Sequence, residues 1–232
     1  MKRRCAVILT LCSISLYSTL FPALILAEAL PEGFVYVETI IPDIHTELRY
    51  FSDENFLGCR VSGYLAPRCI LTKEAAESLK KVQDELKQFG MGLKIFDAYR
   101  PQCAVDHFVQ WGKDLNDTKM QAKYYPDVQK RDLFKEGYIA ERSSHSRGST
   151  VDLTIVYLDQ QSTELDMGTH FDFFGPEAWP ESPLVSPVHR AHRMLLNVLM
   201  KKYGFDSYSK EWWHFTLKNE PFPHTYFNFP VR

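Results

Sequence analysis

The residues that decide the fold are 149–158, STVDLTIVYL, a stretch that alternates in polarity and is rich in β-branched side chains. This composition and period predict a β-strand. Asp152 stands inside the strand, between Val151 and Leu153. A carboxylate among apolar side chains needs a partner, so the strand also indicates where a functional site could lie.

Two more strands are predicted around this one. The segment 92–101, GLKIFDAYRP, is a short apolar run that ends in a charge and a proline. The segment 211–217, EWWHFTL, is followed by a proline-containing tail. Residues 34–48 are expected to form strand and loop, because they begin with a β-prone run.

Three helices are predicted between the strands. The first has Thr72 as its N-cap and ends at Gly90, and the second covers residues 104–115. The third opens with Ser186 as N-cap and Pro187 at the first helical position, and it ends at Gly204. The expected apolar faces are Ala75, Ala76, Leu79, Val82 and Leu86 on the first helix, and Ala191, Met194, Leu195, Val198 and Leu199 on the third.

The alternation of helices and strands predicts an α+β fold, in which helices pack on a small, mainly antiparallel sheet. A chain of 232 residues suits one such domain rather than two. Residues 117–144 and 160–187 lack a strong period and are expected to be long connections, the first with short helical pieces.

The composition is that of a soluble globular protein, with 45% hydrophobic and 24% charged residues. The formal net charge of -2 argues against a nucleic-acid partner, which favours a basic patch. Charge says little else about the substrate.

The N-terminus has the pattern of a secretory signal peptide. A basic segment at residues 2–4 precedes an apolar run that reaches about Ala27, and Ala27 and Ala29 form an A-x-A pattern. We therefore expect a signal peptide at residues 1–29 and a mature domain at 30–232. The mature protein is expected to be exported, periplasmic or secreted, without stable membrane insertion. The alternative is an uncleaved membrane anchor, because the run is long enough to span a bilayer.

Export changes how the cysteines are interpreted. Cys59, Cys69 and Cys103 would remain after cleavage, and an oxidising compartment permits a disulfide. An odd count leaves one thiol over, and the pairing stays open, although Cys59 with Cys69 would close a short loop. The sequence has no C-x-x-C pair, so zinc binding by thiolates has little support.

Two clusters place metal-ligand residue types on or beside predicted strands. The first is SSHSRGSTVD, with His145 and Asp152, and the second is EWWHF, with Glu211 and His214. Two imidazoles and a carboxylate make a three-ligand zinc set that leaves the fourth position open for water. Glu211 is the candidate general base, since that base must lie near the water without being a ligand. Positions three apart face opposite sides of an ideal strand, so Glu211 should lie where the strand begins or twists.

Each feature also has a plainer interpretation. His145 alone could be an exposed polar residue in a serine-rich loop, and EWWHF alone could be a core strand with aromatic packing. Arg100, at the end of its strand, could form a surface ion pair with Asp97. Its functional interpretation is a cation that stabilises the oxyanion formed when water attacks an amide.

Several motifs together resemble the D-alanyl-D-alanine dipeptidases of the vancomycin-resistance type. They are FDAYRP, SSHSRGSTVDLT, MGTHFDFF and EWWHF, with LRYFSDENF, KYYPDV and PFPHTYFNFP in the same order along the chain. The resemblance runs from about Leu48 to the C-terminus. It implies a zinc metallopeptidase with an α+β fold shared with D,D-carboxypeptidases, and a zinc site at the sheet.

The resemblance also implies a role for each matching residue. His145, Asp152 and His214 would hold one zinc ion per chain, and Glu211 would be the general base. Arg100 would stabilise the tetrahedral intermediate. Tyr50, Ser143 and Asp172 would line the dipeptide site, where Asp172 would meet the substrate's ammonium group.

Two alternatives to the dipeptidase interpretation remain open at this point. A D,D- or L,D-carboxypeptidase that trims peptidoglycan stem peptides would use a similar zinc set in a cleft open toward the amino side of the substrate. A wall-binding protein would hold a zinc of purely structural role. An exported dipeptidase would meet D-Ala-D-Ala released from peptidoglycan, so wall turnover or nutrient recovery is expected rather than resistance. The sequence leaves the oligomeric state open.

Overall fold

The computed structural model describes residues 29–159 and 161–232, so the predicted signal peptide lies outside the described residues except for Ala29. Its main sheet has five strands in the order β2-β4-β5-β7-β6. β2 pairs with β4 in parallel, and every other pairing in this sheet is antiparallel. The strands are β2 (His45–Thr46), β4 (Met91–Asp97), β5 (Thr150–Tyr157), β6 (Phe205–Ser207) and β7 (His214–Leu217). The predicted α+β class and small, mainly antiparallel sheet are confirmed.

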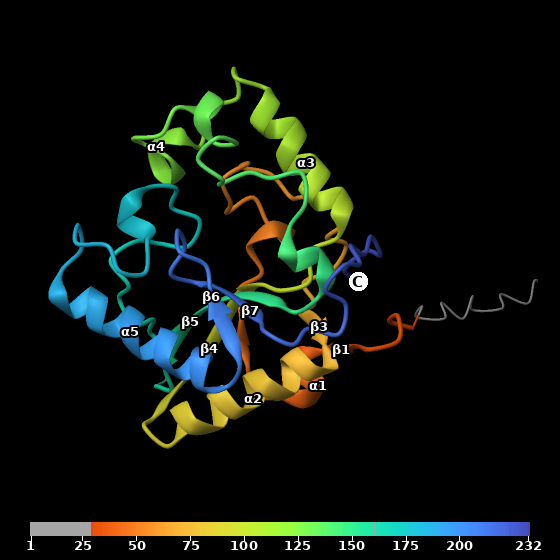
Figure 1. The fold of residues 1–232 in the computed structure, drawn as a ribbon, viewed down its shortest axis with the longest axis vertical. Helices are drawn as coiled ribbons and strands as arrows, with labels where there is room; N and C mark the ends of the chain where they lie inside the picture. The colour runs from red at the N-terminus through yellow and green to blue at the C-terminus, as the bar shows by residue number, and fades with distance from the viewer. Residues whose placement is uncertain (1–28, 160) are drawn as a thin grey trace, which may run out of the picture.

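A second, two-stranded sheet and five helices complete the fold. The sheet pairs β1 (Phe34–Tyr36) with β3 (Ile70–Thr72) in antiparallel orientation. In Figure 1, α2 and α5 run along the lower part of the molecule, α3 and α4 lie at its upper end, and the main sheet lies between them. The helices are α1 (Val37–Ile40), α2 (Lys73–Lys87), α3 (Gln102–Lys113), α4 (Gln121–Tyr124) and α5 (Pro187–Lys202). Short 3-10 turns cover Arg49–Phe51, Lys130–Asp132, Ser144–Arg147 and Pro176–Ala178.

The first predicted helix is confirmed as α2, and its apolar face is the predicted one. All five expected residues are buried against the sheet: Ala75, Ala76, Leu79, Val82 and Leu86. Thr72 occupies the N-cap position, but its hydroxyl does not cap the helix. That hydroxyl instead shares a 2.7 Å hydrogen bond with the hydroxyl of Ser149, which ties the start of α2 to the start of β5.

The predicted apolar face of the third helix is only partly correct: Leu199 is buried and Leu195 packs against the core, but the other three predicted residues are exposed. Ser186 does cap α5, because its hydroxyl accepts a hydrogen bond from the His189 amide. However, Met194 and Val198 are 63% and 56% exposed, while Leu196, Leu199 and Met200 are buried. Arg193 is buried with them, and its guanidinium donates hydrogen bonds to the carbonyls of Met167, Glu177 and Trp179. α5 therefore turns the Arg193 side chain inward, where it donates hydrogen bonds to loop carbonyls. Hydrophobic periodicity alone does not predict an inward-facing arginine.

Two element boundaries also differ from the prediction. α3 begins at Gln102 and ends at Lys113, two residues earlier at both ends than expected. β7 begins only at His214, because residues 211–213 form a turn before it. Trp213 is buried in that turn, with its ring 5.4 Å from the ring of Phe171. Glu211 thus lies where the strand begins, as its spacing from His214 predicted.

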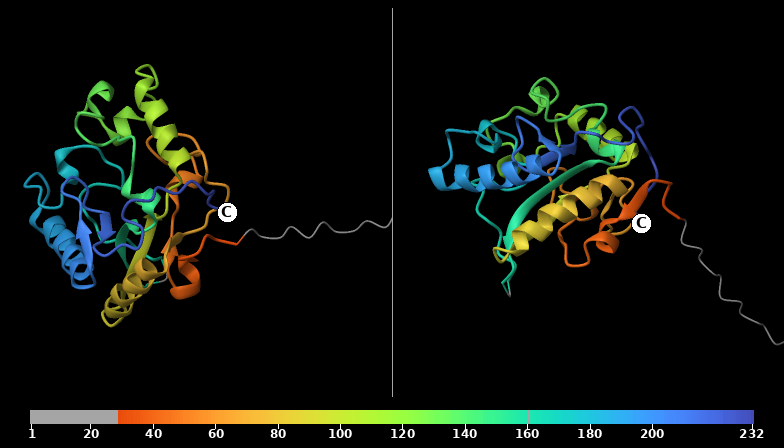
Figure 2. Two further views of the ribbon diagram at one scale, coloured as in Figure 1. Left: turned by 45° about the vertical axis from the view of Figure 1, so that its right-hand side comes forward. Right: turned by 60° about the horizontal axis from the view of Figure 1, so that its bottom comes forward.

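The C-terminal segment, residues 218–232, crosses back over the start of the described chain, and Figure 2 shows its end beside β1. Its Phe222, Phe227 and Phe229 rings surround Phe34, with centroids 4.9–5.7 Å away. The Phe227 amide donates to the Ser146 carbonyl at 2.8 Å, and the Val231 amide donates to the Gly63 carbonyl at 2.9 Å. The segment therefore fastens loops that are far apart in sequence.

The expected export bears on two further features of the described residues, membrane-spanning helices and disulfides. None of the helices among them is both long and apolar enough to cross a membrane. Cys59, Cys69 and Cys103 are free thiols in this structure.

The corrected face of α5 gives a direct test of the core. Leu196→Ala is expected to lower the free energy of unfolding by about 2–5 kcal/mol, because it leaves a cavity at a fully buried position. Met194→Ala, two positions away and exposed, should change it by no more than about 0.5 kcal/mol. Urea unfolding monitored by circular dichroism measures both. Equal losses in the two variants would mean that the face described here is wrong.

Candidate metal centre and substrate pocket

The register of the central strands brings three functional side chains into one row. Asp97 on β4 lies opposite Asp152 on β5, which lies opposite His214 on β7. The pairing of β4 with β5 shifts by one residue between Ile95 and Asp97. Without this bulge Asp97 would face Val151, because Ile95 faces Leu153. A bulge of this kind re-aims a side chain at a site.

His145 joins this row from the turn before β5. It lies in the 3-10 turn Ser144–Arg147. Ser143 caps this turn, because its hydroxyl accepts a hydrogen bond from the His145 amide. The turn ends at Gly148, where φ is +85°. A Cβ at Gly148 would lie 2.2 Å from the Phe34 ring, so only glycine fits there without displacing Phe34. The chain is thereby folded back tightly enough for His145 to reach Asp152.

The predicted ligand atoms of His145, Asp152 and His214 all lie within 4.8 Å of one another. The His145 Nε2 atom is 3.3 Å from His214 Nδ1 and 3.2 Å from Asp152 Oδ2. His214 Nδ1 is 3.2 Å from Asp152 Oδ1. Two atoms bound to a tetrahedral zinc at about 2.1 Å lie about 3.4 Å apart. The donor pairs therefore lie close to the spacing that a zinc ion requires, with each imidazole nearest to a different oxygen of Asp152.

Their surroundings fit a metal as well. Asp152 Oδ1 is buried and makes no hydrogen bond of full geometry among the described residues, where its nearest nitrogen is His214 Nδ1 at 3.2 Å. The other ring nitrogens are occupied, since His145 Nδ1 lies 2.7 Å from the Ala98 carbonyl and His214 Nε2 lies 3.3 Å from the Ser144 hydroxyl. Such outer contacts fix the orientation of imidazole ligands. The Ala98 and Ser144 contacts were not predicted, because they depend on the fold around the turn.

Burial and the neighbouring charges shift the pKa values of all three residues in the cluster. Burial acts to raise the pKa of Asp152, but the two imidazoles outweigh it and hold that pKa well below its usual range. Burial and the charge of Arg100 lower the pKa of His145. Burial also opposes the charging of His214, yet Asp152 and Glu211 raise its pKa. Positive charge close to Asp152, from a proton on His214 or from a cation, stabilises the ionised carboxylate.

Glu211 lies beside the cluster without belonging to it. Its Oε2 atom is 3.5 Å from His214 Nδ1. Burial, together with the charge of Asp152, raises the pKa of Glu211 to about 7. A general base works best with a pKa near the operating pH, so position and protonation both suit the predicted role.

Arg100 lies between the candidate metal ligands and two aromatic rings. It does pair with Asp97, at 2.8 Å from Nη2 to Oδ2, but the pair is buried and not on the surface. Its Nη2 atom also lies 3.4 Å from Asp152 Oδ2. The guanidinium carbon lies 4.9 Å from the Tyr50 ring centroid and 5.1 Å from that of Phe108. The cation is therefore held at the edge of the metal cluster, where charge on a substrate oxygen could develop.

Tyr50 and Asp172 come together on another wall of the pocket. The Tyr50 hydroxyl donates to both carboxylate oxygens of Asp172, at 3.0 and 3.2 Å. Asp172 has a φ of +61°, a left-handed conformation that costs energy for a non-glycine residue. Burial, reinforced by the charge of Asp152, raises the pKa of Asp172 well above its ordinary value. A buried carboxylate in a strained backbone position is typical of a ligand-binding group.

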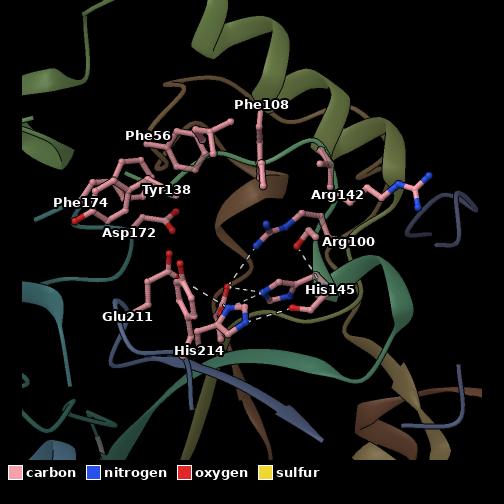
Figure 3. Close-up of a pocket in the computed structure, with 18 of the residues that line it drawn as sticks. Phe56, Arg100, Phe108, Tyr138, Arg142, His145, Asp172, Phe174, Glu211 and His214 are labelled. Carbon is pink, nitrogen blue, oxygen red and sulfur yellow. Dashed lines mark hydrogen bonds and ion pairs between the residues drawn. The ribbon is translucent and has the colours of Figure 1, made fainter. Parts of the chain in front are cut away.

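Figure 3 shows how these groups surround one cavity. His145, His214 and Glu211 lie along one side, and aromatic side chains lie across from them. All eight predicted site residues line this pocket: Tyr50, Arg100, Ser143, His145, Asp152, Asp172, Glu211 and His214. The aromatic wall of Phe56, Phe108, Tyr138 and Phe174 was not predicted. Asp97 could have been suspected, as a carboxylate that ends a buried strand three residues before Arg100.

Comparison with known proteins gives one family and a consistent set of relatives. The family model described as D-ala-D-ala dipeptidase matches residues 31–232. A D-alanyl-D-alanine dipeptidase of Enterococcus faecalis is 38% identical over 86% of this chain and 98% of its own length. One from Streptomyces coelicolor is 39% identical over 85% and 98%. One from Escherichia coli is 35% identical over 79% and 83%.

Among solved structures, a zinc-bound D,D-pentapeptidase from a vancomycin-resistance cassette is 14% identical. The match covers 67% of this chain and 77% of that one, with a TM-score of 0.41. A likeness this weak carries no argument about activity.

Removal of a ligand should separate metal binding from folding. His214→Ala is expected to weaken zinc binding by more than about 100-fold, the upper limit for loss of an outer contact alone. His192→Ala, which removes a histidine on α5 that hydrogen-bonds only the Asp166 carbonyl among the described residues, should leave zinc binding unchanged. Zinc content after dialysis against a graded chelator measures both. Full retention of zinc by His214→Ala would exclude this cluster as the metal site.

Proposed function

Since the chain belongs to the family of D-Ala-D-Ala dipeptidases, which are zinc peptidases, we propose that it hydrolyses D-alanyl-D-alanine to two molecules of D-alanine in the pocket of Figure 3. The observation that supports this site best is the juxtaposition of three features. A three-donor cluster at zinc spacing lies beside a carboxylate that is not a ligand, and a buried aspartate lies in the same pocket.

His145, Asp152 and His214 are proposed to hold one zinc ion per chain. When bound, zinc acts as a Lewis acid that polarises the scissile carbonyl and lowers the pKa of the attacking water. Ala98 and Ser144 would keep the two imidazoles in position through their contacts with the far ring nitrogens. Oδ1 of Asp152, which makes no hydrogen bond of full geometry among the described residues, would gain a positive ligand partner.

Asp172 is proposed to bind the ammonium group of the dipeptide. A charged substrate amine offers the positive partner that the carboxylate lacks, and this would return the pKa of Asp172 toward its ordinary value. The Tyr50 hydroxyl, which donates to both Asp172 oxygens, would aim the carboxylate at that amine. Ser143, on the turn that carries His145, is proposed as a further contact for the dipeptide.

Glu211 and Arg100 are proposed to carry out the proton transfer and the charge stabilisation. Glu211 takes a proton from the water as its oxygen attacks the carbonyl carbon. Negative charge then develops on the carbonyl oxygen, and Arg100 stabilises it from the edge of the pocket. As the C–N bond breaks, Glu211 returns this proton to the leaving nitrogen and is restored. The remaining water proton passes from the newly formed carboxylic acid to the released amine, so that both products are amino-acid zwitterions.

Selectivity for a dipeptide would follow from the wall that holds Asp172. A longer peptide has an amide where the dipeptide has an ammonium group, so it would place an uncharged nitrogen against a buried carboxylate. Sites that hydrogen-bond a specific substrate group reject analogues that leave their own polar groups unpaired. The rival D,D- or L,D-carboxypeptidase activity requires an open amino side of the cleft, and the buried Tyr50–Asp172 pair argues against it.

The location and physiological role are proposed from the sequence alone. Residues 1–29 are proposed to be a cleaved signal peptide and residues 30–232 the mature, exported domain. Outside the cytoplasm the substrate would be D-Ala-D-Ala released from peptidoglycan. The activity would then serve wall turnover or nutrient recovery.

Substitution of the general base should stop turnover without loss of metal. Glu211→Gln is expected to lower kcat by about 100- to 10,000-fold, because the amide cannot accept the proton of the water. Zinc content should be unchanged, since Glu211 lies outside the ligand cluster. Glu164→Gln, an exposed carboxylate paired with Lys94, is the control and should keep full activity. Normal turnover by Glu211→Gln would exclude Glu211 as the base.

The substrate class is tested by D-alanine release from D-Ala-D-Ala and from a stem pentapeptide, each with and without a chelator. We expect release from the dipeptide only, with loss of activity on chelation and recovery on addition of zinc. Release from the pentapeptide alone would move the protein to the carboxypeptidases. Activity that survives complete zinc removal would contradict the metal-dependent mechanism.

A further inference from the structure

The guanidinium of Arg100 depends on one carboxylate for its orientation. Asp97 Oδ2 accepts from Arg100 Nε at 2.9 Å and lies 2.8 Å from Nη2, so one oxygen engages two nitrogens. The only other carboxylate within ion-pair distance among the described residues is Asp152, at the longer distance of 3.4 Å. Asp152 belongs to the metal cluster, so a shift of Arg100 toward it would compete with the metal.

Tyr64 determines how the Asp97 carboxylate is turned. Its hydroxyl donates to Asp97 Oδ1 at 2.6 Å, while Oδ2 serves Arg100. Asp97 is 1% exposed and Tyr64 is 2% exposed, so water does not replace either contact. His145 Nδ1 lies 3.5 Å from Asp97 Oδ2. A carboxylate released by Tyr64 could therefore turn toward His145 and loosen its hold on Arg100.

Backbone hydrogen bonds on either side of Tyr64 hold this residue in place. The Val231 amide donates to the Gly63 carbonyl at 2.9 Å, and the Leu65 amide donates to the Val231 carbonyl at 2.8 Å. Tyr64 thus lies between two backbone hydrogen bonds to the C-terminal segment. Gly63 has a φ of +85°, and a Cβ there would lie 2.6 Å from Pro101 Cγ, beside Arg100 in sequence. The loop that carries Tyr64 is therefore packed against the strand end that carries Arg100.

We propose that Tyr64 is a positioning residue for the hydrolysis: through Asp97 it holds Arg100 where the oxyanion forms. The inference rests on the proposed function, because it assumes that Arg100 meets the substrate oxygen. Tyr64 does not line the substrate pocket, so it acts through the Asp97 carboxylate and not on the dipeptide. A positioning role affects the transition state more than the binding of the ground state.

The test is the kinetic effect of Tyr64→Phe, which keeps the ring and removes only the hydroxyl. We expect kcat for D-Ala-D-Ala to fall about 10-fold, with KM changed by less than about 2-fold and zinc content unchanged. Tyr99→Phe is the matched control. Tyr99 is also buried, and its hydroxyl donates to the Phe229 carbonyl at 2.9 Å, so it loses a comparable hydrogen bond one residue from Arg100 without touching Asp97.

Measuring Tyr64→Phe in an Arg100→Lys enzyme tests whether Tyr64 acts through Arg100. If Tyr64 acts by positioning the guanidinium, Tyr64→Phe should have almost no further effect on kcat in an Arg100→Lys enzyme, because the bidentate hold is already lost. Asp97→Asn should lower kcat as much as Tyr64→Phe does. If Tyr64→Phe folds poorly, Asp97→Asn therefore tests the same contact between Asp97 and Arg100. A fall in kcat of equal size in both arginine and lysine backgrounds would overturn the proposal.

The outcomes also separate this inference from the proposed function. A wild-type enzyme that cleaves the dipeptide, with Tyr64→Phe and Asp97→Asn both at wild-type kcat, would overturn the positioning role alone. A zinc-loaded, folded wild-type enzyme without activity on the dipeptide would overturn the proposed function and this role together. A loss of kcat in Tyr99→Phe equal to that in Tyr64→Phe would mean that the effect is general destabilisation. That outcome would overturn the positioning role of Tyr64.

Discussion

The cross-strand row Asp97, Asp152 and His214 is the constraint on which the rest of the structure depends. Side chains directly opposite one another on neighbouring antiparallel strands come within about 4.5–5.5 Å of each other at Cβ. A one-residue slip of β7 against β5 would send His214 to the other face of the sheet. The bulge in β4 and the tight turn at Gly148 then bring Asp97 and His145 to the same row. The metal cluster, the orientation of Arg100 and the position of Glu211 all follow from this register.

The same arrangement concentrates negative charge in a space with little water. Asp97, Asp152 and Asp172 are buried near one another, Glu211 is partly buried beside them, and Arg100 and His214 offer the nearby positive charge. Burial and mutual repulsion raise the pKa of Asp172 and of Glu211. A divalent metal at the cluster and an ammonium group at Asp172 would each supply charge that the protein lacks. The pocket is thus complementary to a cation and to a positively charged amine before either arrives.

The sequence predicted the features that depend on local pattern and missed those that depend on tertiary contact. α2 and β5 were predicted because their residues repeat with the helical and strand periods. The eight candidate site residues were chosen from ligand types and motif resemblance, and they line one pocket. The apolar face of α5 was predicted only in part, because Arg193 is turned inward to donate hydrogen bonds to three carbonyls of a loop. The turn at residues 211–213 was predicted as strand, because buried tryptophans are common in both. Tyr64 was missed since it reaches Asp97 across 33 residues of chain.

The row of strands also determines when the protein could first bind its metal during synthesis. His145 and Asp152 are made together, but His214 follows about sixty residues later on β7. A nascent chain therefore has two donors for as long as it takes to make those residues, at roughly 5–20 residues per second. A two-donor site binds zinc far more weakly than a complete one, so the metal cannot guide the early steps of folding. The three donors come together only when β5 pairs with β7, so the complete candidate site exists only in a chain whose sheet has formed.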